Sequence, residues 1–281
     1  MTSPAREATI TVRAMRWAAR LRVRHWAHFL VLPLATFPGA SEPLALLALL
    51  RGLAIAAAIL SFGYLLNGIT DRALDRDPGK NPLVSEPARP AHLRAVVGLA
   101  GCALVLALSG PPIVILATLT ALGAGWAYSA GPRLKRLPFV GTLLNAACFT
   151  PLLFVGASAE VSPPWWLAAA FTALLLENQL LHEGEDALED RGGAIRTTYA
   201  VLGPTGAACA MALFGLGVAA VALALGGGAT ITLVLAIVFG VAFPASCAWS
   251  RGDGARLRRL RAAHRVAALL AGALVFVLAR A

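Results

Sequence analysis

Apolar residues follow one another in long runs along the whole chain, and short polar connections separate these runs. A bilayer hydrocarbon core is about 30 Å thick, and a helix crosses it with about 20 consecutive apolar residues. The pattern therefore predicts an all-α, polytopic membrane protein with nine transmembrane helices. The predicted spans are residues 25–40, 50–70, 92–109, 111–128, 138–157, 163–182, 203–226, 229–249 and 262–279.

The composition agrees with this pattern and leaves no stretch for a second, soluble domain. Apolar residues make up 58% of the 281 positions and charged residues only 14%, whereas soluble domains carry about a quarter charged residues. Residues 1–24 are polar and rich in arginine, without the apolar core and cleavage site of a signal peptide. We expect them to form a cytoplasmic arm that precedes one membrane domain over residues 25–281.

The basic residues predict an orientation for these helices. The net charge is +10, but the basic residues fall in alternate connections, which is typical of membrane topology and argues against a nucleic-acid partner. The opposite connections, near residues 39–43, 109–112, 157–164 and 225–230, contain no Lys or Arg. The positive-inside rule then places the N-terminus in the cytoplasm and the C-terminus outside. The basic connections carry Arg13, Arg16, Arg20, Arg22 and Arg24, then Arg72, Arg76, Lys80 and Arg89, then Arg133, Lys135 and Arg136, then Arg191 and Arg196, and finally Arg251, Arg256, Arg258, Arg259 and Arg261.

The few acidic residues are concentrated in two places. Of fourteen, three lie in residues 71–77 and five in residues 183–190. Both groups fall at the predicted cytoplasmic end of a span, the second and the sixth. In the first group, Asn67, Asp71 and Asp75 are spaced four apart, so a helix that continued through them would project all three from one face.

The second acidic group repeats this arrangement. Glu183, Asp186 and Asp190 have i, i+3, i+7 spacing, which again places them on one helical face. Asp186 and Asp190 each lie 115 residues after their counterparts Asp71 and Asp75. The common offset hints at two related helical halves that present matching carboxylates.

Aligned carboxylates repel each other unless a cation lies between them, and acidic residues near a membrane interior are candidates for function. Mg²⁺ prefers oxygen ligands and completes its shell with water and phosphate oxygens. We therefore interpret the clusters as sites for Mg²⁺ and a diphosphate, with nearby basic residues as phosphate donors. The alternative is that the clusters are solvated helix ends and that the basic residues only anchor the topology. In that case the clusters would pair with Arg72, Arg76 and Arg191.

These residues, taken in order, resemble the UbiA superfamily of intramembrane prenyltransferases, whose fold is a nine-helix bundle around a central cavity. The family pattern is N-D-x-x-D-x-x-x-D after the second helix, a Y-x-x-x-P-x-x-K-R-like segment, and D-x-x-D-x-x-x-D after the sixth. The segment Arg22–Trp26 is similar to the family's basic and aromatic opening of the first helix. The matching residues are Asn67, Asp71 and Asp75, then Tyr128, Lys135 and Arg136, then Glu183, Asp186 and Asp190.

Three positions depart from the family pattern. Gly68 stands where the family commonly has the first Asp, and Glu183 replaces the first Asp of the second motif. Ala194 occupies a position where the family usually has Gly. The Glu183 replacement keeps a carboxylate, whereas Gly68 removes one, so the first cluster is expected to bind metal less well than the second.

The resemblance implies an enzyme that transfers a prenyl group from an isoprenoid diphosphate to an acceptor, either aromatic or another lipophilic small molecule. It further implies an integral protein of a bacterial plasma membrane, with the active site facing the cytoplasm. The four aspartates of the motifs are assigned as catalytic. The implied Mg²⁺ ligands are Asn67, Asp71, Asp75, Glu183, Asp186 and Asp190, and the implied diphosphate-binding residues are Asn67, Arg22, Lys80, Tyr128, Lys135, Arg136 and Arg196.

Two other functions are compatible with the sequence. In a terpene cyclase of the same family, a double bond of the substrate itself would capture the allylic cation. A transporter or lipid-binding protein would use the acidic clusters as an ion site, although transporters usually place such groups near mid-membrane on broken helices. The identity of the acceptor, the prenyl chain length and the oligomeric state are left open by the sequence.

Overall fold

The computed structural model is helical, and it has no strand among the residues that it describes. This confirms the all-α prediction. The described residues form two compact units: unit 1 contains those up to Pro132 together with 151–158, and unit 2 contains 133–150 and those from 164 onward. The described residues are 15–36, 45–75, 77–79, 81–87, 89–158, 164–187 and 196–280.

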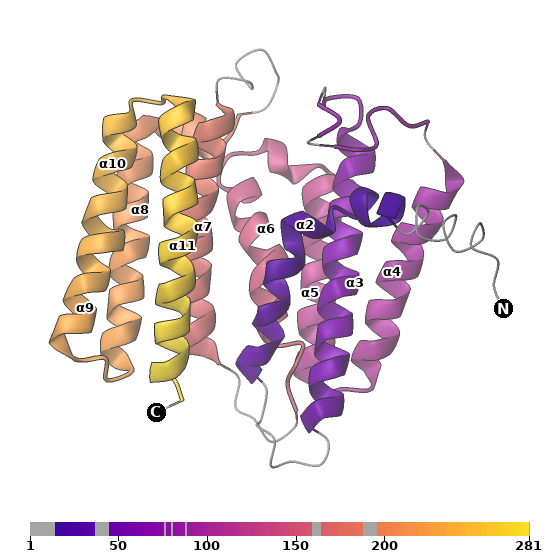
Figure 1. The fold of residues 1–281 in the computed structure, drawn as a ribbon, viewed down its shortest axis with the longest axis horizontal. Helices are drawn as coiled ribbons and strands as arrows, with labels where there is room; N and C mark the ends of the chain where they lie inside the picture. Colours follow the sequence, from indigo (N-terminus) through magenta and orange to yellow (C-terminus); the bar gives the residue numbers. More distant parts are fainter. Residues whose placement is uncertain are drawn as a thin grey trace. The chain divides into compact units, whose positions relative to one another are not determined.

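Unit 1 is organised around the helix that carries the first acidic cluster, α3 (Ala45–Asp71) (Figure 1). This helix packs against α4 (Pro90–Leu108), α5 (Pro112–Ser129) and the 3-10 helix η1 (Ala27–Thr36). A short helix, α2 (Val23–Trp26), leads into η1. Both α4 and α5 begin with a proline, whose fixed φ suits the first helical turn and whose missing N–H is not needed there.

Glycines allow backbone contact within unit 1. A Cβ on Gly52 of α3 would lie 2.6 Å from the Cα of Gly156, and a Cβ on Gly156 would lie 2.3 Å from the carbonyl oxygen of Pro33. Distances this short leave no room for a side chain. Small residues at such contacts are typical of membrane helices, where close van der Waals packing holds the helices together.

Arg51 joins three segments at one end of unit 1. Its Nη1 donates a hydrogen bond to the carbonyl oxygen of Ser109 at 3.0 Å, and its Nη2 donates to that of Ala157 at 2.7 Å. Ser109 is the C-cap of α4, where a helix end carries partial negative charge that favours a cation. The start of α3, the α4–α5 turn and Ala157 therefore lie together, and the acidic cluster lies at the other end of α3.

Unit 2 consists of the helices that follow Pro132 (Figure 1). Its elements are η2 (Leu134–Arg136), α6 (Val140–Phe149), α7 (Trp165–Asp186), α8 (Thr198–Ala224), α9 (Gly228–Ile237), the π-helical segment η5 (Val238–Ala242), α10 (Phe243–Ser250) and α11 (Gly254–Leu278). The 3-10 helix η3 (Thr150–Leu153) begins in this unit and ends in unit 1. Helix α8 is the centre of unit 2, since it packs against α7, α9, η5, α10 and α11.

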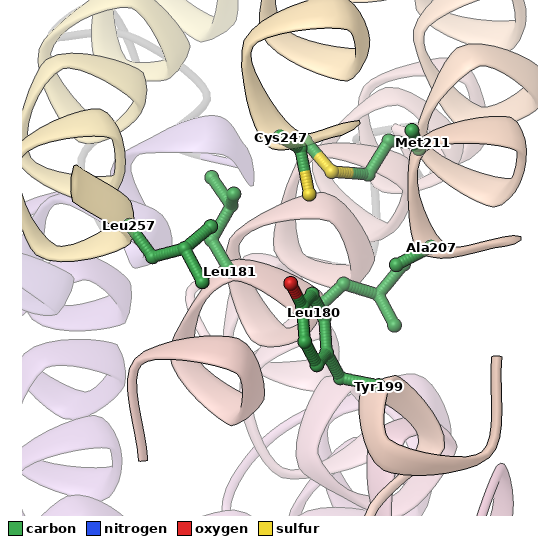
Figure 2. Close-up of a cluster of buried hydrophobic side chains, with 8 residues drawn as sticks. Leu180, Leu181, Tyr199, Ala207, Met211, Cys247 and Leu257 are labelled. Atoms are coloured by element: carbon green, nitrogen blue, oxygen red, sulfur yellow. The ribbon is translucent and has the colours of Figure 1, made fainter. Parts of the chain in front are cut away.

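Helices α7, α8, α10 and α11 of unit 2 share an apolar core (Figure 2). Leu180 and Leu181 come from α7, Tyr199 from α8 and Leu257 from α11, and all four are almost fully buried. The Tyr199 ring also packs on Gly184, where a Cβ would lie 2.8 Å from the ring. This cluster fixes the C-terminal end of α7 against α8 and α11.

The backbone departs from regular α-helix within α8 and in the helical segment that packs against it. Gly203 has a φ of 67° inside α8, a conformation that glycine adopts at no steric cost, and Pro204 follows it. The π-helical segment η5 precedes Pro244, which has no N–H to continue the helical ladder. Gly215 lies against η5 so closely that a Cβ would be 2.2 Å from the carbonyl carbon of Phe239.

A buried polar pair joins α7 to α11. The Nε2 of His264 lies 2.8 Å from the Oε2 of Glu177, and both side chains are fully buried. The rings of Phe239 and Phe243 pack edge-on against the imidazole. In such apolar surroundings either polar group alone would be costly, so each depends on the other.

Among the residues that the structure describes, six helices are long and apolar enough to cross a membrane: Ala45–Asp71, Pro90–Leu108, Pro112–Ser129, Thr198–Ala224, Gly228–Ser250 and Gly254–Leu278. They coincide with six of the nine predicted spans. The predicted first and fifth spans coincide in part with interrupted helical segments, η1 with Pro33 inside it and α6 followed by η3 with Pro151. The sixth coincides with α7, whose second half is made less apolar by residues 177–179 and His182. The count of nine and the orientation of the N-terminus stay predictions.

The contact between Gly215 and η5 predicts that Gly215→Ala destabilises the protein by about 2 kcal/mol, because the new methyl group overlaps the Phe239 backbone. Gly217→Ala is the matched control, since Gly217 lies in the same helix with nothing within 4 Å of its Cβ position. It should change stability by no more than about 1 kcal/mol, in the stabilising direction, because alanine favours a helix over glycine. Melting temperatures in detergent compare the two, and equal values for both variants would contradict the close approach.

Candidate functional site

The first acidic cluster lies where α3 ends. Asn67 and Asp71 are one turn apart on this helix, and Asp71 is 9% exposed. The prediction that all three residues share one face required a helix that continued through Asp75, and α3 ends at Asp71. The dipeptide Asp77-Pro78 follows closely, and the residue before a proline is disfavoured in a helix.

Asp75 is held instead by Asn81, which is fully buried. The Nδ2 of Asn81 donates to the Oδ2 of Asp75 at 2.9 Å and to the carbonyl oxygen of Gly68 at 2.9 Å. Its Oδ1 accepts from the backbone N–H of Leu83 at 3.1 Å. Asn81 thus fastens the connection after α3 back onto the last turns of that helix.

This arrangement also explains Gly68, where the family pattern commonly has an aspartate. A Cβ at Gly68 would lie 3.3 Å from the Oδ1 of Asn81 and 3.3 Å from the Cδ1 of Leu83. A side chain there would therefore require Asn81 or Leu83 to shift by a few tenths of an ångström. Asn81 was not among the predicted site residues, and the only local signal was the Asn-Pro dipeptide, which marks a turn.

Other predicted residues of unit 1 lie around the same end of α3. The Oδ1 of Asn67 accepts a hydrogen bond from the Oγ of Ser129 at 3.2 Å, and Ser129 follows Tyr128 at the end of α5. The guanidinium of Arg22 lies over the ring of Tyr64, 5.3 Å from its centroid, one turn before Asn67. The predicted phosphate donor Lys80 lies outside the described residues.

The second cluster, on the last turns of α7, contains carboxylates in different surroundings. Glu183 is buried, and its oxygens accept hydrogen bonds from Thr142, Gln179 and the backbone of Tyr199. The side chain of Asp186 is 29% exposed, with the Nδ1 of His182 3.4 Å from its Oδ2. Asp190 lies outside the described residues.

Glu185, between these two residues, is not part of the same face. Its Oε1 accepts from the Nε of Arg258 at 2.8 Å, and its Oε2 accepts from the Nη1 of Arg261 at 3.0 Å. Both cations come from α11. Glu185 therefore attaches the end of α7 to α11. Arg191, the partner considered for this cluster in the alternative interpretation, lies outside the described residues.

The segments that carry the basic residues of unit 2 are held near this end of α7 by hydrogen bonds that neighbouring residues make. Lys135 and Arg136 lie in η2, and the backbone N–H of Phe139 just after them donates to Thr198 Oγ1 at 2.7 Å. Arg196 is exposed two residues before Thr198. Of the predicted middle segment, Tyr128 thus belongs to unit 1 and both cations belong to unit 2.

The donor set suits Mg²⁺, because the accessible groups are carboxylate and amide oxygens. In the part of the chain that the structure describes, no group of three or more His, Cys, Asp or Glu side chains lies close enough to hold a metal ion. Mg²⁺ often takes only one or two protein carboxylates and fills its shell with water and phosphate oxygens. Each cluster can therefore contribute to such a site without enclosing the ion.

Comparison with known proteins confirms the resemblance. A model of the UbiA prenyltransferase family matches residues 25–267. A solved UbiA homologue from Archaeoglobus fulgidus bound to GPP and Mg²⁺ has a TM-score of 0.70 and 21% identity, over 95% of this chain and 100% of that one. A digeranylgeranylglyceryl phosphate synthase has a TM-score of 0.75 and 14% identity, over 95% and 98%. A UbiA homologue from Aeropyrum pernix K1 has a TM-score of 0.66 and 20% identity, over 94% and 98%. No curated protein matches the chain.

The contacts of Asn81 predict a strong effect of Asn81→Asp. The substitution keeps the shape but removes both donated hydrogen bonds and places a second carboxylate against Asp75, at a cost of about 3 kcal/mol. Combining it with Asp75→Asn restores one donor–acceptor pair and should recover part of the loss. Melting temperatures of the two variants measure both effects, and a wild-type value for Asn81→Asp alone would show that Asn81 does not hold this connection.

Proposed function

The chain belongs to the UbiA prenyltransferase family, and from that premise we propose that it transfers a prenyl group from an isoprenoid diphosphate to a lipophilic acceptor in the membrane, with Mg²⁺. The acceptor is aromatic or another small lipophilic molecule. The observation that carries the proposal is that each unit has carboxylates at or just after the end of a long helix, Asp71 and Asp75 in one and Asp186 in the other. A related UbiA homologue has been solved with GPP and Mg²⁺, and also with DMAPP and Mg²⁺.

The proposed site divides its tasks between acidic and basic residues. Asp71, Asp75, Asp186 and Asp190, together with Asn67, would hold Mg²⁺. The cations and the tyrosine hold the diphosphate oxygens, since guanidinium and ammonium groups are suitable phosphate donors. These diphosphate-binding residues are Arg22, Lys80, Tyr128, Lys135, Arg136 and Arg196, together with Asn67.

The proposed reaction requires the bond between the allylic carbon and the diphosphate oxygen to break. Bound Mg²⁺ would supply positive charge that stabilises the leaving diphosphate. The basic side chains donate hydrogen bonds to the same oxygens as the bond lengthens and negative charge develops on them. The electron pair leaves with the diphosphate, and the acceptor forms the new bond to carbon and loses a proton. Apolar helices exclude water, which would otherwise capture the allylic carbon.

We further propose that the protein crosses the bilayer nine times, with its N-terminus and its active site on the cytoplasmic side of a bacterial plasma membrane. The distribution of Lys and Arg supports this orientation. Water-soluble Mg²⁺ and the polar diphosphate would then reach the acidic clusters from the cytoplasm. The prenyl chain would remain among the apolar helices.

The proposal predicts that Asp71→Asn and Asp186→Asn each lower Mg²⁺-dependent turnover of geranyl diphosphate by about 100-fold or more, because each removes charge that holds the metal. Asp253→Asn is the matched control. Asp253 is the N-cap of α11 and accepts hydrogen bonds from the backbone N–H groups of Ala255 and Arg256, and asparagine caps a helix equally well. Turnover is measured as released pyrophosphate from purified protein with Mg²⁺ and a panel of acceptors.

Mass spectrometry of the products tests the reaction type in the same experiment. A product whose mass is the sum of prenyl group and acceptor, less one proton, supports prenyl transfer. A hydrocarbon formed without any acceptor would instead indicate a cyclase. Wild-type turnover in both the Asp71 and the Asp186 variants would overturn the metal assignment.

A further inference from the structure

The carboxylate of Glu183 is bound on both oxygens by groups of its own unit. Its Oε1 accepts from Thr142 Oγ1 at 2.7 Å and from Gln179 Nε2 at 3.3 Å, and its Oε2 accepts from the Tyr199 N–H at 3.0 Å. A carboxylate offers about four acceptor positions, so protein donors occupy most of them. Glu183 is only 8% exposed, whereas the side chain of Asp186, three residues on, is 29% exposed.

In the hydrogen-bond network around Glu183, every hydroxyl proton is donated toward the carboxylate. Thr198 Oγ1 accepts from the Phe139 N–H at 2.7 Å and is itself hydrogen-bonded to Thr142 Oγ1. Because Thr142 gives its single hydroxyl proton to Glu183, the Thr198 hydroxyl must donate to Thr142. The acceptor-only carboxylate at the end of the network therefore orients both hydroxyl groups.

This network connects three charged segments of unit 2. The acidic end of α7 carries Asp186. Thr198 is the first residue of α8 and follows Arg196 by two residues, and Phe139 is the N-cap of α6 and follows Arg136 by three. The basic turn, η2, is also tightly packed, because a Cβ on Gly141 would lie 2.9 Å from the carbonyl oxygen of Lys135.

We propose that Glu183 is a positioning residue and not a Mg²⁺ ligand: its buried carboxylate holds the basic turn and the start of α8 beside the acidic end of α7. A metal ion at Glu183 would have to displace donors that the protein already supplies. The inference rests on the proposed function, because it takes the charges near the network to bind Mg²⁺ and diphosphate. Loss of the network should therefore weaken diphosphate binding and leave metal binding unchanged.

Two substitutions break the network in different places. In Glu183→Gln, the amide oxygen must face the fixed Tyr199 N–H, so the NH₂ group faces Thr142 and reverses the direction of its hydrogen bond. Thr142→Val removes the middle hydroxyl and leaves the Glu183–Tyr199 bond intact, so it tests the proposal even if Glu183→Gln fails to fold. Thr142→Ser keeps the hydroxyl and should restore wild-type behaviour. Thr150→Val is the matched control, because it removes a Thr150–Thr172 bond elsewhere in the unit.

The test uses purified full-length protein with Mn²⁺ and inorganic pyrophosphate, and needs no turnover. Electron paramagnetic resonance measures Mn²⁺ binding at saturating pyrophosphate, and calorimetry measures pyrophosphate binding at saturating Mn²⁺. Glu183→Gln and Thr142→Val should weaken pyrophosphate binding about tenfold and leave Mn²⁺ binding unchanged. Asp186→Asn should weaken Mn²⁺ binding about tenfold or more, and Thr142→Ser and Thr150→Val should resemble the wild type.

Each other outcome has a distinct meaning. If Glu183→Gln weakens Mn²⁺ binding as much as Asp186→Asn, Glu183 is a ligand and the positioning role is wrong. If both network variants melt at lower temperature but bind pyrophosphate like the wild type, the network only stabilises the fold, and the proposal is likewise overturned. A wild-type protein that binds no pyrophosphate with Mn²⁺ would contradict the proposed function, and the positioning role with it.

Discussion

The buried carboxylate of Glu183 is the contact on which the geometry of unit 2 depends. A charged or polar group removed from water is costly unless hydrogen bonds compensate for the loss. Here the compensating donors come from α6, α7 and the start of α8, so these segments must stay in register for the carboxylate to be satisfied. Tyr199 donates its backbone N–H to this carboxylate, and its ring packs in the apolar core shown in Figure 2.

In unit 1, the corresponding buried polar group is a neutral side chain. The connection after α3 is held by the buried amide of Asn81, both of whose Nδ2 protons and whose oxygen are hydrogen-bonded. One of those protons orients Asp75, so the same amide that closes the connection also places a predicted metal ligand. The two acidic clusters are therefore supported by different chemistry, an amide in one unit and a carboxylate in the other.

Several other polar side chains inside the units connect one helix to another. Arg51 binds two backbone carbonyls at the opposite end of α3, Glu177 and His264 pair across α7 and α11, and Glu185 binds two arginines of α11. The fully buried pair of Glu177 and His264 satisfies groups that would be expensive alone in apolar surroundings. Elsewhere, glycine contacts such as Gly215 on η5 allow the backbones of neighbouring helices to touch. Close packing of this kind holds helices together where the hydrophobic effect does not distinguish a neighbouring helix from lipid.

The sequence by itself determined the helical class, the positions of six long apolar helices among its nine predicted spans, and the positions of the acidic and basic segments. It could do so because apolar runs, charge and residue spacing are properties of neighbouring residues. It also identified the family, since three motifs in order are specific even where Gly68 and Glu183 depart from them. Only the tertiary structure decided what each polar side chain does. Glu183 and Asp186 read alike as carboxylates one turn apart, but residues of α6 and α8 bury the first and leave the second accessible. The end of α3 at Asp71 and the part played by Asn81 depend on how the following connection folds back, and no local spacing records such a contact between distant residues.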